Sequence, residues 1–164
     1  MAITAWSAIW FLPFALPISI WVAWNDMKFM KIPNKAVMAL IIVFLVVGLV
    51  AIPLAEYPWR LLQFAVVLLI GFLLNMIRAI GAGDAKFAAA MAPLIAPGDI
   101  RLLLYLLAAV IVAAVITHRA FRKSKAIRKL TPDWESWTRK DFPMGLALGS
   151  TLAFYLIAGA VYGA

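Results

Sequence analysis

The sequence contains no cysteine and only one histidine. The lack of cysteine excludes disulfides, thiolate zinc sites and cysteine nucleophiles. His118 cannot build a metal site alone, and its place in a basic stretch predicts a solvated side chain. We therefore expect the protein to work without a metal or another cofactor.

Charged residues are also scarce. They make up 13% of the 164 residues, whereas 66% are hydrophobic and the mean hydropathy is +1.01. Soluble domains are about a quarter charged. A soluble core of this size cannot hide so much apolar surface, so we expect lipid to surround the chain. The length suits a single membrane domain, residues 1–164. No Lys or Arg precedes the first apolar run, which predicts a retained membrane helix rather than a cleaved signal peptide.

Six apolar intervals between charged residues define candidate membrane helices. They are Ala2–Asn25, Ala36–Ala55, Leu61–Ile77, Phe87–Gly98, Leu102–Thr117 and Phe142–Ala164. A membrane-spanning helix needs roughly 20 apolar residues. The fourth interval would cover only about 18 Å as a helix. If it crosses the bilayer, this helix must include residues from the preceding "GAGDAK" (81–86), lie where the bilayer is locally thinned, or be shielded by its neighbours.

The distribution of Lys and Arg predicts how the helices are oriented. If all six cross and the N-terminus lies outside, the segments 25–35, 78–86 and 118–141 face the cytoplasm and hold 13 of the 15 Lys and Arg residues. This is a strong positive-inside bias. Without the fourth helix, the basic segment 118–141 would lie outside. We therefore predict an all-α membrane protein with six transmembrane helices and both termini on the non-cytoplasmic side.

Two isolated acids stand out against this apolar background. Asp26 lies in "WNDMKFMKIPN", residues 24–34, and Asp84 lies in "AIGAGDAKFAA", residues 79–89. Ionisable groups in membrane segments are costly and are functional candidates. The alternative is that they are surface acids neutralised by Lys28 and Lys86, or helix caps. Both acids fall on the same side in the predicted topology, which favours a shared site.

Two carboxyl groups in one site cannot both ionise easily. The ionised group can take a proton from water, while the protonated group binds a peptide carbonyl oxygen and later supplies a proton. This chemistry requires no metal, cysteine or serine–histidine pair. Gly81 and Gly83 suit such a site, because glycine backbone can pass close to a substrate or adopt a positive φ.

Three motifs resemble those of the type IV prepilin peptidases. "GAGDAK" resembles their Gly-x-Gly-Asp-x-Lys motif, and "DMKFMKIPN" resembles their aspartate followed by Ile-Pro-Asn. "FPMGLALG", residues 142–149, is similar to the Pro-x-Gly motif that opens their last helix. The resemblance covers essentially the whole chain. It implies an aspartic endopeptidase of the bacterial inner membrane, which removes a short basic leader from prepilins on the cytoplasmic side.

The resemblance also implies roles for residues and partners. Asp26 and Asp84 would be the catalytic pair. The residues expected to support the site or bind substrate are Gly81, Gly83, Lys86, Pro33, Asn34, Pro143 and Gly145. Larger family members carry paired Cys-x-x-Cys zinc ligands and also methylate the product. This cysteine-free chain resembles instead the short, peptidase-only type of tight-adherence pili. The implied partners are a prepilin-like protein with an N-terminal apolar helix and the lipid bilayer.

Other functions remain open at this stage. A presenilin-like protease shares Gly-x-Gly-Asp, but this chain lacks the Pro-Ala-Leu motif of that group. A small proton-coupled carrier or channel would use the two acids as a proton relay, and a non-catalytic component of a pilus or secretion assembly would need neither acid.

We expect the basic segment 118–141 to fix orientation and rest on anionic lipid rather than act as a lid or guide. Topology explains its charge without nucleic-acid binding, and the oligomeric state stays open.

Overall fold

A computed structural model describes all 164 residues, and every regular element is helical, which confirms the all-α class. The α-helices are α1 (Ala5–Phe29), α2 (Asn34–Ala51), α3 (Tyr57–Met76), α4 (Ala82–Met91), α5 (Ile100–Lys123), α6 (Lys125–Leu130) and α7 (Met144–Tyr162). Three short 3-10 helices are η1 (Ala92–Leu94), η2 (Pro97–Asp99) and η3 (Glu135–Trp137).

Five helices are long and apolar enough to cross a membrane: α1, α2, α3, α5 with its preceding turn, and α7. The predicted fourth span, Phe87–Gly98, is not one continuous helix. Its helical part, α4, begins earlier, at Ala82, so it extends into the preceding residues. Near Pro93 and Pro97 the chain changes to η1 and η2, because proline lacks the N–H that would continue an α-helix. A sixth crossing therefore stays a prediction.

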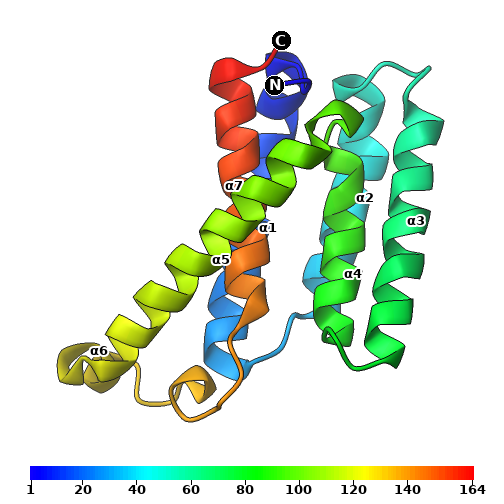
Figure 1. The fold of residues 1–164 in the computed structure, drawn as a ribbon. Coiled ribbons are helices and arrows are strands. Elements are labelled where there is room, and N and C mark those ends of the chain that lie inside the picture. Colours follow the sequence, from blue (N-terminus) through cyan, green and yellow to red (C-terminus); the bar gives the residue numbers. More distant parts are fainter.

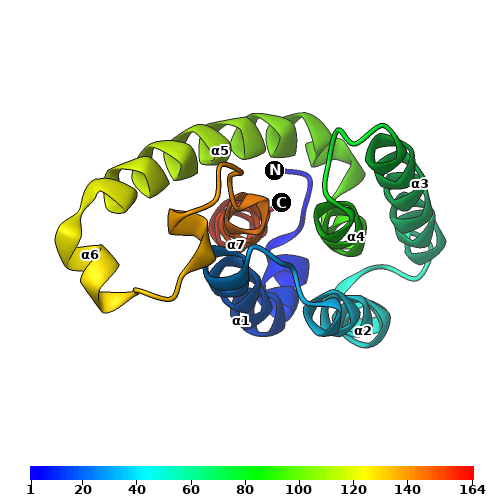
Figure 2. The same ribbon diagram turned by 90° about the horizontal axis from the view of Figure 1, so that it is seen from below.

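The helices are arranged so that the two chain termini lie at one end of the molecule (Figure 1). The turn between α1 and α2, the turn between α3 and α4, and the segment that contains α6 and η3 lie at the opposite end. Seen from that end, α7 is central and has α1 on one side and α4 on the other (Figure 2). The two candidate acids, Asp26 near the end of α1 and Asp84 at the start of α4, both lie at the end away from the termini.

Glycines allow α7 to pack closely against α1. A Cβ at Gly149 would lie 2.6 Å from the carbonyl oxygen of Ser19, and one at Gly159 would lie 3.0 Å from the Cβ of Ala8. Small residues at helix interfaces let two backbones approach in a membrane, where packing replaces the hydrophobic effect. These two contacts hold α7 against α1 along their length, so the start of α7 lies beside the last turn of α1.

Near the termini, a buried carboxylate joins three distant parts of the chain. Asp99 accepts hydrogen bonds from the backbone N–H groups of Ala2 (2.7 Å) and Ile3 (2.9 Å) and from the hydroxyl of Tyr155 (2.9 Å). The same hydroxyl accepts a bond from the N–H of Ala96. This network ties the N-terminal segment and α7 to the turn between α4 and α5.

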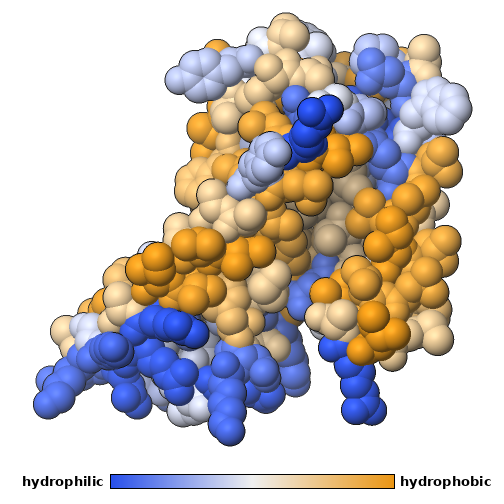
Figure 3. Space-filling view, in the orientation of Figure 1, coloured by the Kyte–Doolittle hydropathy of each residue, from blue (hydrophilic) through white to orange (hydrophobic).

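The outer faces of α3 and α5 are covered by exposed hydrophobic side chains (Figure 3). Trp59, Ile70 and Tyr105 are all more than half exposed. Soluble monomers rarely expose apolar patches of this extent. Helices satisfy their own backbone hydrogen bonds, so such surfaces can face lipid. The fold is thus that of a multi-pass membrane protein.

Candidate active site

Asp26 is buried in the last turn of α1 and is held by the start of α7. Its Oδ2 accepts a hydrogen bond of 2.6 Å from the backbone N–H of Gly145. Asp26 as a whole is only 5% exposed. The first N–H groups of a helix have no partner within the helix, so they are free to bind a carboxylate. A Cβ at position 145 would lie 2.8 Å from the Cβ of Asp26. Glycine is therefore required for this contact.

Asp84 is half-buried in the first turn of α4. A Cβ at Gly81 would lie 2.6 Å from its Oδ2, so the carboxylate folds back over a position that has no side chain. A Cβ at Gly83 would lie 3.3 Å from the Cβ of Ile32. No glycine in the chain has a positive φ, so that predicted role for Gly81 and Gly83 is wrong. Each is explained by a close approach, one to the acid and one to the turn before α2.

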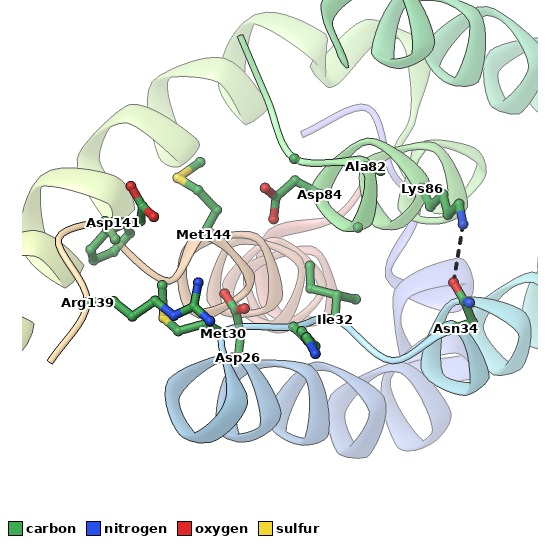
Figure 4. Close-up of a pocket in the computed structure, with 14 residues that line it drawn as sticks. Asp26, Met30, Ile32, Asn34, Ala82, Asp84, Lys86, Arg139, Asp141 and Met144 are labelled. Carbon is green, nitrogen blue, oxygen red and sulfur yellow. Dashed lines mark hydrogen bonds between the residues drawn. The ribbon is translucent and has the colours of Figure 1, made fainter. Parts of the chain in front are cut away.

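The two acids line the same cavity, of about 500 Å³. Asp26 enters it from α1 and Asp84 from α4, and both carboxylates point into it (Figure 4). The structure thus brings together the two residues that the sequence paired. They come from helices that flank α7 rather than pack side by side.

Neither acid is neutralised by a neighbouring lysine. Both salt bridges of the chain form between other residues. Lys28 lies over an aromatic ring, and Lys86 donates from Nζ to Oδ1 of Asn34 at 3.4 Å. The alternative in which Lys28 and Lys86 pair with Asp26 and Asp84 is therefore wrong.

The residues expected to support the site divide into two groups. Those that line the cavity are Gly81, Gly83, Lys86 and Asn34. Those that lie behind it are Pro33, Pro143 and Gly145. Pro33 and Pro143 occupy the N-cap positions of α2 and α7. Proline suits the beginning of a helix, where a missing N–H leaves no bond unmade. The second group therefore sets where α2 and α7 start.

The two motifs also touch each other directly. Gly83 packs against Ile32, and Lys86 bonds to Asn34, which follows Ile32 by two residues. The turn before α2 and the first turns of α4 consequently form one wall of the cavity. Asp26 and Asp84 project from the two chain segments that this wall joins.

Two residues at the end of the basic segment, Arg139 and Asp141, also line the cavity, as does Phe142, which follows it. The end of segment 118–141 thus lies at the acid cavity, and the expectation that the segment rests on anionic lipid stays a prediction. The position of these residues follows from the Pro-x-Gly motif. Because Gly145 must reach Asp26, the residues just before it are brought to the rim of the cavity.

An aromatic stack folds the basic segment back toward the bundle. The ring of Trp137 stacks on His118, with centroids 5.2 Å apart, and on Trp134, with centroids 5.6 Å apart. Trp134 also meets Trp24 of α1 edge to face. His118 is only 5% exposed, so the prediction of a solvated histidine is wrong. Stacking on Trp137 withdraws it from water.

Charges of both signs surround the cavity. The acids are Asp26, Asp84 and Asp141, and the bases are Lys31, Lys86 and Arg139. No three His, Cys, Asp or Glu side chains gather where they could hold a metal ion. What the arrangement offers chemically is two carboxylates, free of salt bridges, at the edge of a hydrophobic bundle.

Comparison with known proteins identifies the family. The model of the type IV leader peptidase family matches residues 2–117, a range that includes Asp26, Asp84 and both of their motifs. No curated protein and no solved structure gives a match. Since the family match covers well over half of the sequence, the chain belongs to the type IV leader peptidase family, as its motifs led us to expect.

Proposed function

We propose that this protein is an aspartic endopeptidase that removes the leader from prepilin-like substrates, with Asp26 and Asp84 as its catalytic pair. Membership of the family supports a leader peptidase in general. The observation that carries the aspartic mechanism is the cavity into which both carboxylates point, with no salt bridge to either. A proton-relay carrier would place such acids near the middle of the membrane, whereas these lie at one end of the bundle.

In the proposed reaction, a water molecule is bound between the two carboxyl groups. The ionised carboxylate takes a proton from this water as its oxygen attacks the peptide carbonyl carbon. The protonated carboxyl group hydrogen-bonds the carbonyl oxygen, which stabilises the charge that develops there. The carboxyl group that took the water's proton then gives it to the amide nitrogen as the C–N bond breaks, which releases the leader with a new carboxyl end and leaves the substrate with a new amino terminus. The other carboxyl group is left protonated, so the pair again holds one proton.

The contacts of Asp26 support this use. Its Oδ2 is occupied by the N–H of Gly145, whereas Oδ1 has no hydrogen-bond partner in the protein. One oxygen therefore fixes the carboxylate, and the other is free to face water. Holding a reacting group in place in this way contributes to catalysis because little reorganisation is needed during the reaction.

We propose that the acid-containing end faces the bacterial cytoplasm. The segments 25–35, 78–86 and 118–141, which hold 13 of the 15 Lys and Arg residues, lie at this end, opposite the termini. The positive-inside rule then favours this orientation. In this arrangement α4 completes a sixth crossing together with η1 and η2, shielded from lipid by its contact with α3.

Co-expression with a candidate prepilin tests the proposed function. The wild-type protein should produce a shorter prepilin, and mass spectrometry should place the new terminus between a basic leader and an apolar segment. Asp84→Asn should leave the prepilin at full length, because the remaining acid has no partner carboxyl. Normal processing by this variant at equal membrane levels would overturn the aspartic mechanism.

A further inference from the structure

A second cavity lies on the side of α4 that faces α5, between the acid site and the end of the bundle that holds the termini. Helix α5 begins next to η2, packs against α7 and diverges from α3 and α4 toward the acid end (Figure 1). The space between them has a volume of about 620 Å³ and mostly hydrophobic walls, with Val66 of α3, Ala88 of α4, Leu104 of α5 and Leu148 of α7 among the lining residues. We call it the lateral groove. The space-filling view shows it as an apolar hollow between α5 and the column of α3 and α4 (Figure 3).

The lateral groove leads to the catalytic acids. Ala88 lies one helical turn from Asp84 on α4, and Leu148 lies one turn from Met144 on α7, so each pair shares a helix face. Asp84 and Met144 line both the acid cavity and a neighbouring hollow of about 460 Å³, which opens beside residues 78–81. A chain in the groove can therefore reach Asp84 by passing between the first turns of α4 and α7.

Other sideways routes to the acids are closed by contacts. The α1–α7 side is sealed where Gly145 meets Asp26 and Gly149 meets Ser19. The α2–α4 side is sealed near the site by Gly83 against Ile32. No comparable packing joins α5 to α4. The open approach to Asp84 therefore lies on the side of the lateral groove, by way of the hollow beside residues 78–81 that Asp84 lines.

We propose that the lateral groove binds the apolar helix of the prepilin, the part of the substrate that follows the cleaved bond. This rests on the proposed function, because it assumes a substrate with a polar leader before an apolar helix. The polarity of the two spaces matches that order: the groove is apolar, whereas the acid cavity carries three acids and three bases. The groove comes within one helical turn of the acid cavity at Ala88 and Leu148, which is the end where the scissile bond must arrive.

Cross-linking from single cysteines tests this placement, since the natural chain has none. Leu104→Cys and Val66→Cys place a thiol in the groove, and Val46→Cys places one on the exposed face of α2 as a matched control. A photoreactive benzophenone is attached to each thiol in enzyme that also carries Asp84→Asn, so that the prepilin stays intact. We expect prepilin cross-links several-fold stronger from positions 104 and 66 than from 46.

The possible outcomes test the groove assignment separately from the proposed catalytic mechanism. Equal cross-linking from all three positions, or cross-linking of lipid alone from the groove, would overturn the proposal. If enzyme with an intact Asp84 cleaves prepilin while the groove positions fail to cross-link it, the proposed function stands and the groove assignment fails. If the groove positions cross-link but the wild-type protein never cleaves, the substrate assignment stands and the mechanism fails.

Filling the groove provides a second, kinetic test. Leu104→Trp adds volume to its wall without touching either acid. We expect a several-fold higher KM for full-length prepilin and an unchanged kcat, because only docking is hindered. Val46→Trp, on α2, is the matched control and should change neither value. An unchanged KM with a lowered kcat in Leu104→Trp would contradict the assignment.

Discussion

Oδ2 of Asp26 accepts a 2.6 Å hydrogen bond from the backbone N–H of Gly145, which lies 119 positions further along the chain. The first helix thus supplies the acid, and the last helix fixes its orientation. The family match ends at residue 117, yet this contact makes α7 part of the site. The glycine of the Pro-x-Gly motif is therefore explained by its contact with the acid.

Gly145→Ala should reduce cleavage strongly. Its Cβ would lie 2.8 Å from the Cβ of Asp26, so either α7 or the carboxylate must shift. A displacement of about 1 Å at a catalytic group can cost about 100-fold in rate, and we expect a loss of that order in kcat. The measurement is the initial rate of prepilin cleavage by purified protein, corrected for the folded fraction.

Gly149→Ala is the matched control for this variant. Its Cβ would lie 2.6 Å from the carbonyl oxygen of Ser19, an equally tight contact between the same two helices. It should lower the Tm but reduce the cleavage rate of the folded protein much less than Gly145→Ala does. Equal rate losses in the two variants would mean that general helix packing, rather than the position of Asp26, limits the reaction.

Gly81→Ala and Gly83→Ala should differ in effect. A Cβ at position 81 would lie 2.6 Å from Oδ2 of Asp84, so the carboxylate must move. A Cβ at position 83 would lie 3.3 Å from Ile32, which can adjust by a few tenths of an ångström. We expect at least about a tenfold loss of kcat for Gly81→Ala, corresponding to ~1.4 kcal/mol in the barrier, and a smaller loss for Gly83→Ala. The reverse order of rates would contradict this assignment.

Asp99→Asn should destabilise the protein without changing its chemistry. The carboxylate accepts bonds from Ala2, Ile3 and Tyr155 at the end of the molecule away from the acids. The loss of charge-assisted bonds in a buried site should lower the free energy of unfolding by about 1–3 kcal/mol. Tyr155→Phe removes only one of these bonds and should cost less. A thermal unfolding series, with the cleavage rate of the folded fraction as control, checks both.

Trp137→Ala should weaken substrate binding. Trp137 stacks on His118 and Trp134 and holds the segment that brings Arg139 and Phe142 to the cavity. Without the stack, these residues should lose their fixed position, which raises the KM for prepilin several-fold and increases protease sensitivity near residue 139. Trp10→Ala, on the exposed face of α1, is the control. Equal KM values in the two variants would show that the rim plays no part in binding.

Much of this arrangement was predictable because charges are rare in the sequence. In a lipid environment each charged residue must lie at an end or in a site, so the gaps between charges located the five long helices and singled out Asp26 and Asp84. Helix α4 begins at Ala82 and so includes residues of the preceding "GAGDAK" motif, but it ends at Met91, and a sixth crossing stays a prediction.

The parts that the sequence did not reveal depend on contacts between distant residues. The burial of His118 results from Trp137, a residue in a segment rich in charge whose composition predicts exposure. The roles of Gly81 and Gly83 depend on which atoms approach them, and composition alone left a positive φ equally plausible. Neither relation produces a periodic pattern, so both required the three-dimensional structure.

The most direct test of the proposed catalytic pair, Asp26 and Asp84, is the rate at which purified protein cleaves one prepilin. We predict no cleavage above the enzyme-free background for Asp26→Asn, for Asp84→Asn or for the double variant, with membrane levels equal to wild type. Asp133→Asn, which changes an exposed acid outside the cavity, should keep the full rate. A substantial rate in either single variant of the pair would contradict the claim that the two carboxyl groups act together.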